Sequence, residues 1–134
     1  MVNKGKIFEP LLYKIAESYR VQRDSYYKIA ALAKKQGQIK DQKEITVFTE
    51  IASEKEQLFE EIAERNIYLK KAKEDIIKAL KIKEFTISAL RENLDTPATN
   101  ELLDVLVETG DAIKELEKSE KENEENLKKI LKLS

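Results

Sequence analysis

Apolar side chains recur every three or four positions along most of this chain, which is the spacing of one face of an α-helix. The first run is Leu12, Ile15, Tyr19, Gln22, Tyr26, Ile29 and Ala33. The second is Ile45, Phe48, Ala52, Phe59, Ile62, Leu69, Ile76 and Leu80, widened by Ile51 and Leu58. The third is Leu102, Leu106, Thr109, Ile113, Leu116, Glu120, Asn123, Leu127 and Ile130. The pattern therefore predicts three long helices, over residues 8–36, 41–83 and 97–131.

Signals at the predicted helix ends support these boundaries. Gly37 follows closely on two lysines, and cations in a last turn with glycine beyond them are typical of a helix stop. Asp41 with Glu44 three residues later resembles a capping box, and Thr96 before Pro97 is typical of a helix start. The connection between the first two helices is short, so the second helix is expected to fold back antiparallel to the first.

The regular pattern weakens at two places. Residues 84–96 contain a β-branched and aromatic run that begins at Phe85 and lowers helix propensity. The pattern there allows either a bent continuation of the second helix or a short separate helix ending near Asn93. Gly110 lies in the middle of the third predicted helix, where glycine costs about 1 kcal/mol relative to alanine. It marks either a close helix crossing or a weak point in the helix.

The predicted helix lengths set the shape of the molecule. At about 1.5 Å per residue the second helix would be about 60 Å long, longer than a compact domain of 134 residues is wide. The fold class is therefore predicted to be all-α. We expect an elongated antiparallel three-helix bundle with coiled-coil-like packing, formed as a single helical domain over residues 1–134.

The residue types present exclude most catalytic chemistry. The chain contains no cysteine and no histidine, so it offers no thiolate nucleophile, no imidazole base and none of the usual zinc, copper or haem ligands. Its many carboxylates lie mostly off the apolar stripes, as expected for solvated helix faces. We therefore expect no enzyme activity, no metal site and no other cofactor.

The apolar segments are too short to cross a membrane. The longest uncharged apolar run covers residues 29–33, against the ~20 residues that a membrane helix needs. The first residues also lack the apolar core of a secretory signal. We therefore expect a cytoplasmic protein with no membrane insertion.

Charge is distributed unevenly along the chain. Residues 1–40 contain nine Lys/Arg and three Asp/Glu, a net charge of +6, whereas residues 41–134 carry a net charge of −7. One interpretation is that a basic first helix packs beside acidic later helices. The alternative is a basic face offered to an acidic partner or to nucleic acid. Nucleic acid is not expected as a partner, because the lysines and arginines are scattered and the whole chain has a net charge of −1.

Two groups of side chains are candidate binding surfaces. The first is the tyrosine set of the first predicted helix: Tyr13, Tyr19, Tyr26 and Tyr27. Such residues are usually core with the hydroxyl at the rim, and the alternative is an exposed recognition surface. The second group lies toward the end of the third predicted helix: Ile113, Leu116, Asn123, Asn126, Leu127, Ile130 and Leu131.

The second group is predicted to form one side of a groove for a partner helix. Glu120 and Asn123 interrupt the apolar seam just before apolar residues resume, and a polar seam residue can specify register at a cost in stability. The first helix is also too short to cover both longer helices, so some apolar stripe should lack a neighbour within the chain. An amphipathic helix in a groove is a recurrent mode of peptide recognition.

Three segments together carry a family resemblance. Residues 22–33, QRDSYYKIAALA, are similar to a first helix in which Gln precedes Tyr and an LxxLA-like run. Residues 51–62, IASEKEQLFEEI, are similar to an acid-rich second helix with EKExL, and residues 123–127, NEENL, to a late NxxN. These features resemble the FlgN family of flagellar export chaperones, small helical proteins that hold hook-associated subunits before secretion. The chain lacks the glycine turn that usually follows the family's second helix, and near the family's late arginine it has only Lys70 or Lys71.

The resemblance implies a cytoplasmic chaperone of type III (flagellar) secretion that binds the C-terminal helical segment of an exported hook-associated protein. Such a chaperone is expected to be a monomer or weak homodimer with apolar surface left for its protein partner. The alternative is a structural coiled-coil scaffold or stalk protein with no chaperone activity. On the chaperone hypothesis, aspartate at both Leu127 and Ile130 is expected to abolish partner binding with little change in the thermal midpoint.

Overall fold

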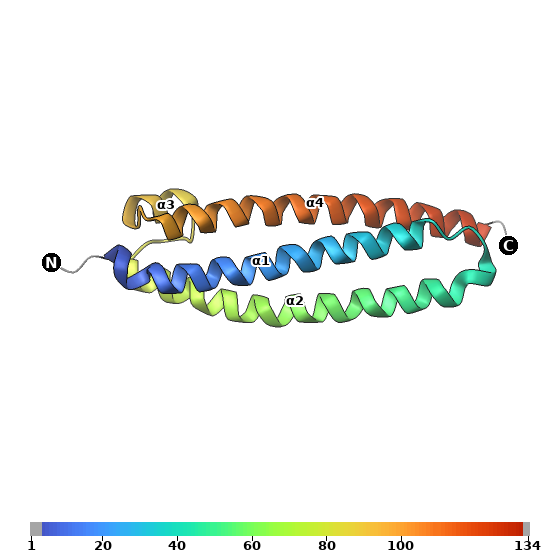
Figure 1. The fold of residues 1–134 in the computed structure, drawn as a ribbon, viewed down its shortest axis with the longest axis horizontal. Helices are drawn as coiled ribbons and strands as arrows, with labels where there is room; N and C mark the ends of the chain where they lie inside the picture. The colour runs from blue at the N-terminus through green and yellow to red at the C-terminus, as the bar shows by residue number, and fades with distance from the viewer. Residues whose placement is uncertain (1–3, 133–134) are drawn as a thin grey trace.

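A computed structural model describes residues 4–132, and in this part of the chain every regular element is helical. The elements are α1 (Lys4–Gly37), the 3-10 helix η1 (Gln42–Glu44), α2 (Ile45–Leu80), α3 (Ile87–Asn93) and α4 (Pro97–Lys132). The three long helices lie side by side along one axis and make the molecule elongated (Figure 1). The predicted all-α bundle is confirmed.

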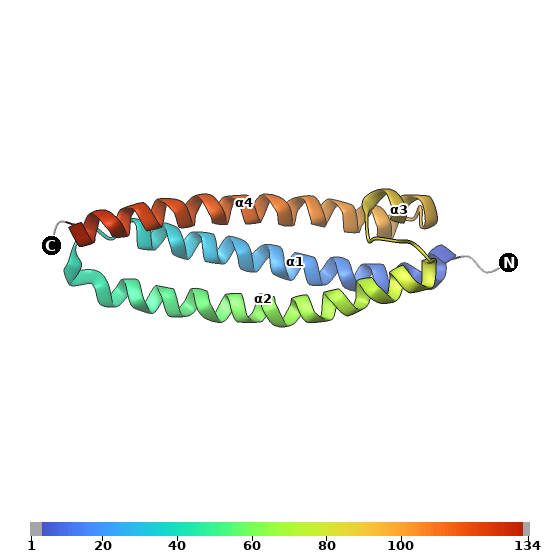
Figure 2. The ribbon, with the colours of Figure 1, turned by 180° about the vertical axis from the view of Figure 1, so that it is seen from behind.

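The chain runs up, down and up again, so α2 is antiparallel to both of its long neighbours while α1 and α4 are parallel to each other (Figure 1, Figure 2). The helix α1 packs along α4 extensively and against α2 less extensively, whereas the α2 and α4 backbones scarcely approach one another. The bundle is therefore a close parallel pair with a third helix laid against one of its members.

Small side chains allow the close approach of α1 and α4. The buried residues of α4 recur at alternating steps of four and three, and they include Ala98, Leu102, Val105, Thr109, Ala112, Leu116, Ser119 and Asn123. The predicted third stripe is therefore wrong at four of its positions, which lie beside the buried row and are only half-buried: Leu106, Ile113, Glu120 and Leu127. Because Ala112 and Ser119 are small, the backbones meet over them, and the larger residues one position further along flank the seam.

Ion pairs join α1 and α4 along one edge of their interface. Arg20 pairs with Glu101, Arg23 pairs with Glu108, and Lys34 lies 2.7 Å from Glu115. The three acids are seven residues apart, so they form one row along α4. The basic first helix does pack beside an acidic later one, as the charge distribution indicated.

The pair of Lys34 and Glu115 responds to pH in a defined direction. Its hydrogen bond lowers the pKa of Glu115 and raises the pKa of Lys34. A lowered carboxyl pKa stabilises the fold above the carboxyl's unfolded pKa, and this contribution is lost as the pH falls through the folded pKa. Both groups are solvent-exposed, so salt screens the contribution.

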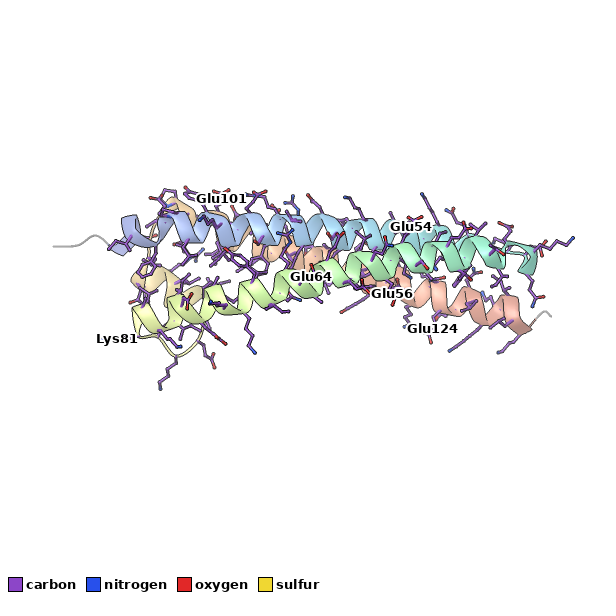
Figure 3. The ribbon with its side chains drawn as sticks, turned by 90° about the horizontal axis from the view of Figure 1, so that it is seen from below. Glu54, Glu56, Glu64, Lys81, Glu101 and Glu124 are labelled. Carbon is purple, nitrogen blue, oxygen red and sulfur yellow. The ribbon has the colours of Figure 1, made fainter. Side chains whose placement is uncertain are left out.

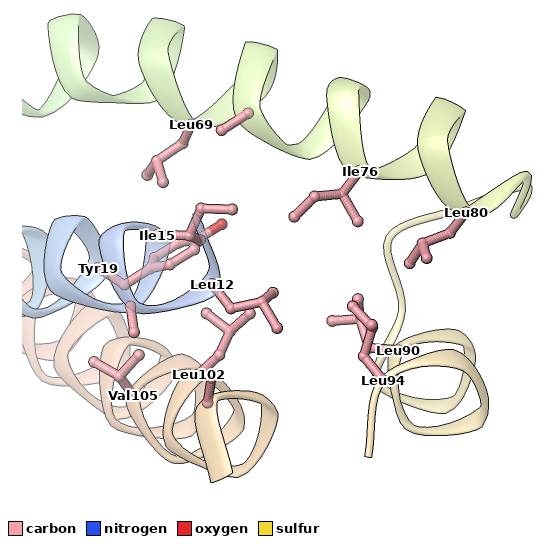
Figure 4. Close-up of a cluster of buried hydrophobic side chains, with 13 residues drawn as sticks. Leu12, Ile15, Tyr19, Leu69, Ile76, Leu80, Leu90, Leu94, Leu102 and Val105 are labelled. Carbon is pink, nitrogen blue, oxygen red and sulfur yellow. The ribbon is translucent and has the colours of Figure 1, made fainter. Parts of the chain in front are cut away.

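The main apolar core lies at the end of the bundle where α3 sits (Figure 4). Its buried members are Leu12, Ile15, Ala16, Tyr19, Leu69, Ala72, Ile76, Leu80, Leu90, Leu94, Ala98, Leu102 and Val105. A second, smaller cluster near the middle consists of Ile29, Ala30, Ile62 and Leu116. Apolar packing thus becomes sparser toward the opposite end, where α1 connects to α2.

Residues 84–96 contain a separate short helix, α3, which decides between the two predicted alternatives. The helix α2 ends at Leu80, three residues before the predicted boundary, and Lys81 adopts a left-handed conformation with φ 57°. The N–H of Ile82 then donates to the Ile77 carbonyl at 3.1 Å. This is a common helix end, and the residue in its left-handed position, here Lys81, is usually a glycine. Thr86 caps α3 by accepting from the Ala89 N–H at 3.2 Å.

The two predicted helix starts have different outcomes. Asp41 does accept a bond from the Lys43 N–H at 3.0 Å, but the turn that it caps is the 3-10 helix η1, and α2 begins only at Ile45. Thr96 accepts from the Thr99 N–H at 3.3 Å, and α4 begins at Pro97 as predicted. The predicted start of the second helix was therefore early by four residues. The predicted start of the first helix was late by four, because α1 begins at Lys4.

Gly110→Ala is expected to raise the free energy of unfolding by about 1 kcal/mol. A Cβ added at Gly110 meets no atom within 4 Å, so this glycine marks a weak point in α4 and not a close helix crossing. Urea denaturation measures the gain. Gly37→Ala, at the last residue of α1 and also facing open space, is the control and should gain less, because it adds helix propensity only at a fraying end. A loss of stability in Gly110→Ala would contradict the open space around this position.

Candidate functional site: the α2–α4 groove

A hollow of about 560 Å³ lies between α2 and α4, near the end of the bundle opposite α3. Its lining residues are Phe48, Ala52 and Lys55 of α2, Glu117, Glu120, Lys121, Asn123, Glu124 and Leu127 of α4, and Gln36 of α1. We call this hollow the α2–α4 groove. Figure 3 views the bundle from the α2 side and labels Glu56 on α2 and Glu124 on α4.

The groove exists because the apolar stripe of α2 is wider than α1 can cover. Ile51 and Ile62 are buried, whereas Phe48 and Ala52 lie on the neighbouring flank and line the groove. Phe59, seven residues after Ala52, falls on the same flank and is 43% exposed. The half-buried flank of α4 supplies the opposite wall. Two partly apolar faces thus remain uncovered by the described chain.

Polar side chains form the floor of the groove around Gln36, which is 1% exposed. Its Oε1 accepts from Lys55 Nζ and from Asn123 Nδ2, both at 2.7 Å. Its Nε2 donates to the Phe48 carbonyl at 3.0 Å. One glutamine at the end of α1 therefore connects all three long helices.

Lys55 continues this floor toward the solvent. Its Nζ lies 2.5 Å from Glu120 Oε1, and because the Oε1 lacks hydrogen-bond alignment, the contact is best described as an ion pair. Lys55 is almost completely buried, whereas Glu120 is about one-third exposed. Removing either partner of such a pair leaves the other charge poorly compensated, so the pair holds α2 against α4 across the groove floor.

Besides Glu120 Oε1, two buried side-chain atoms of α4 have no hydrogen-bond partner among the described residues. They are Asn123 Oδ1 and Ser119 Oγ, on consecutive seam positions of α4. Burial of an unpaired polar group costs about 1–3 kcal/mol. Asn123 lines the groove, and its Oδ1 is an unpaired acceptor with almost no solvent exposure.

The structure divides the seven residues predicted as a binding surface. Leu127 and Asn123 line the groove. Leu116 lies in the smaller apolar cluster and Ile130 is only 4% exposed. The remaining three are Ile113, half-buried on the same flank as Leu127, Asn126, and the exposed Leu131.

Asn126 stabilises the C-terminal end of α1. Its Nδ2 donates to the Ile39 carbonyl at 2.9 Å and to the Gln36 carbonyl at 3.3 Å. These bonds satisfy carbonyl groups that a helix end leaves unpaired. Asn126 therefore ties α4 to the connection between α1 and α2, outside the groove.

Sequence reasoning missed the α2 wall of the groove. Phe48, Ala52 and Phe59 were recognised as part of an apolar stripe, but only residues of the third predicted helix were named as a groove wall. The available signal was the width of the stripe, because these residues lie on a different flank of the helix from Ile51, Leu58 and Ile62. A helix cannot bury both flanks against a single neighbour.

The tyrosine set does not form one surface. Tyr19 is buried and Tyr26 is half-buried, whereas Tyr13 and Tyr27 are exposed. The Tyr19 ring also lies 5.1 Å from Lys73 Nζ, in a cation–π arrangement with α2. The core interpretation therefore holds for Tyr19 and not for Tyr13 or Tyr27.

Among residues 4–132, acidic side chains nowhere gather in a group that could hold a metal ion. None of the helices described here has an apolar stretch that would carry it across a membrane. Comparison of the chain with known protein families, with curated proteins and with solved structures found no match.

Proposed function

We propose that the chain is a helix-binding protein, and that its α2–α4 groove takes up an amphipathic helix of a protein partner. The observation that carries this proposal is the open groove, with the apolar side chains of Phe48 and Leu127 on opposite walls. A helix laid between α2 and α4 would be a fourth member of the bundle. Helix-in-groove binding is a common use of such a surface.

The apolar walls are large enough to support a specific complex. Full burial of a Leu or Phe side chain is worth about 1.5–3 kcal/mol. Phe48, Phe59 and Leu127 are each incompletely buried, so an occupant gains part of this free energy at each position. A micromolar complex needs about −8 kcal/mol, which several such contacts can supply.

The resemblance to FlgN-like proteins adds a biological role and a class of partner to this proposal. A flagellar export chaperone in the cytoplasm would hold the C-terminal helical segment of a hook-associated protein, and would do so as a monomer or weak homodimer. The groove supports this form because such a segment is amphipathic and needs an apolar surface before assembly.

Leu127→Asp is expected to abolish binding of the partner while shifting the thermal midpoint by only a few degrees, about what a change at a partly exposed site produces. Ile130 is left unchanged, because its burial means that aspartate there would destabilise the bundle. The experiment captures partners from native cytosol on the wild-type chain, identifies them by mass spectrometry, and measures the affinity of the recovered protein's C-terminal segment.

Val107→Asp is the matched control, because Val107 is 61% exposed on α4 and lies away from the groove lining. It should bind as the wild type does. Equal binding by wild type and Leu127→Asp would place the site elsewhere. Capture of a partner that is not an exported structural protein would contradict the export role.

A structural scaffold is the second candidate, since the same groove could be filled by another copy of the chain. Sedimentation of the purified protein separates the two functions. A tight oligomer that dissociates on Leu127→Asp would support the scaffold, and a monomer would support the chaperone.

A further inference from the structure

We propose that the α2–α4 groove selects a basic amphipathic helix, one whose apolar face is flanked by lysine or arginine. This inference rests on the proposed helix-binding function and names the chemistry of the partner. Two features support it: the net negative charge of the helix stretches that border the groove, and the ion pairs that basic residues of α1 already form with glutamates of α4.

The two helix stretches that border the groove are acidic when all of their faces are counted, and the residues that line it include three glutamates and two lysines. Residues 50–64 of α2 contain six glutamates and one lysine, a net charge of −5, and that lysine is the buried Lys55. Residues 112–125 of α4 contain six glutamates and three lysines, a net charge of −3. Glu120 is paired with Lys55 in the groove floor and Glu115 with Lys34 of α1. Among the described residues, Glu117 and Glu124 have no ion pair with another helix.

The helix α4 carries two rows of glutamates, and only one row is paired with another helix. The first row, Glu101, Glu108 and Glu115, pairs with the basic residues of α1. The second row is Glu117 and Glu124, also seven residues apart, which line the groove. Glu124 has an exposed contact with Lys128 of the same helix at 3.6 Å. A basic helix in the groove would therefore form ion pairs with Glu117 and Glu124, as α1 does with the first row of glutamates.

The same charges argue against other occupants. A second copy docked groove to groove would bring walls of the same sign, and like charges across an interface are repulsive. Nucleic acid and anionic membrane surfaces are disfavoured for the same reason. The acidic walls therefore favour a basic protein segment over the pairing of two grooves.

The test uses two synthetic helical peptides of about 20 residues, long enough to span about 30 Å. Both carry the same leucine stripe, and the flanking positions are lysine in one and glutamate in the other. The lysine peptide is expected to bind about tenfold or more tightly at about 0.05 M salt, and this advantage should shrink at about 0.5 M salt because the charges are screened. Fluorescence anisotropy of a labelled peptide gives both affinities.

The variant Glu117→Gln with Glu124→Gln is expected to weaken the lysine peptide about fivefold, as the loss of two partly exposed ion pairs should. The matched control is Asp104→Asn with Asp111→Asn, which removes the same charge from exposed positions of α4 that do not line the groove. The control should change the affinity less than about twofold. Circular dichroism checks that both variants keep their helices.

The outcomes separate the two proposals. Equal, salt-independent binding of both peptides would overturn the charge selection and leave the helix-binding function standing. Failure of both peptides to bind would contradict the helix-binding function itself. An equal loss in the control variant would attribute the preference to the net charge of the molecule and overturn the role of the Glu117 and Glu124 row.

Discussion

Leu102→Ala is expected to lower the free energy of unfolding by about 3 kcal/mol, the middle of the range for truncation of a fully buried leucine. Leu102 is completely buried, and Figure 4 shows it in the cluster where α1, α2, α3 and α4 meet. Its removal takes away apolar contacts and leaves a cavity that the surrounding helices fill only in part. Urea denaturation followed by circular dichroism measures the loss.

Val107→Ala provides the comparison on the same helix, because this side chain is exposed. Its change should stay within about 0.5 kcal/mol. If Leu102→Ala cost no more than Val107→Ala, the apolar cluster beside α3 would not be the main source of stability.

Gln36→Ala is expected to cost about 2–3 kcal/mol, because it leaves buried polar groups without partners. Lys55 and Asn123 both lose their shared acceptor, and the Phe48 carbonyl loses a donor. The separate losses do not add in full, since Lys55 can reach water through the groove and keep its contact with Glu120. The same urea measurement applies.

Gln57→Ala is the control for this change, because Gln57 lies on α2 and is exposed. It should be close to neutral. Gln36→Ala should also weaken peptide binding, because the glutamine holds α2 at its distance from α4. A Gln36→Ala protein as stable as Gln57→Ala would show that the polar floor does not hold the three helices together.

The helices themselves were predictable, and the physical reason is that their signals are local. Apolar spacing, the lysines before Gly37 and the Thr96–Pro97 start all act within a few residues. The errors at the ends were local too. The first turn before Ile45 is a 3-10 helix, and Lys81 adopts a left-handed conformation that the sequence pattern gives little reason to expect.

The candidate site was predictable only in part. Leu127 and Asn123 were identified because polar residues interrupt the apolar seam of the third helix just before its apolar residues resume. Leu116 and Ile130 were assigned to the same surface, yet they are buried. Their burial depends on how closely α1 approaches α4, and that distance is set by small residues on both helices at once.

By itself the sequence determined an all-α chain, long helices, their antiparallel succession and a basic first helix suited to an acidic neighbour. Each of these follows from periodicity, end signals or charge that a single segment carries. Only the tertiary structure decided which flank of α4 faces α1, that α2 and α4 scarcely meet, and that Phe48 and Leu127 border a groove. These features depend on the distance between helices, which arises from the side chains of two or three segments packed together and cannot be read from any one of them.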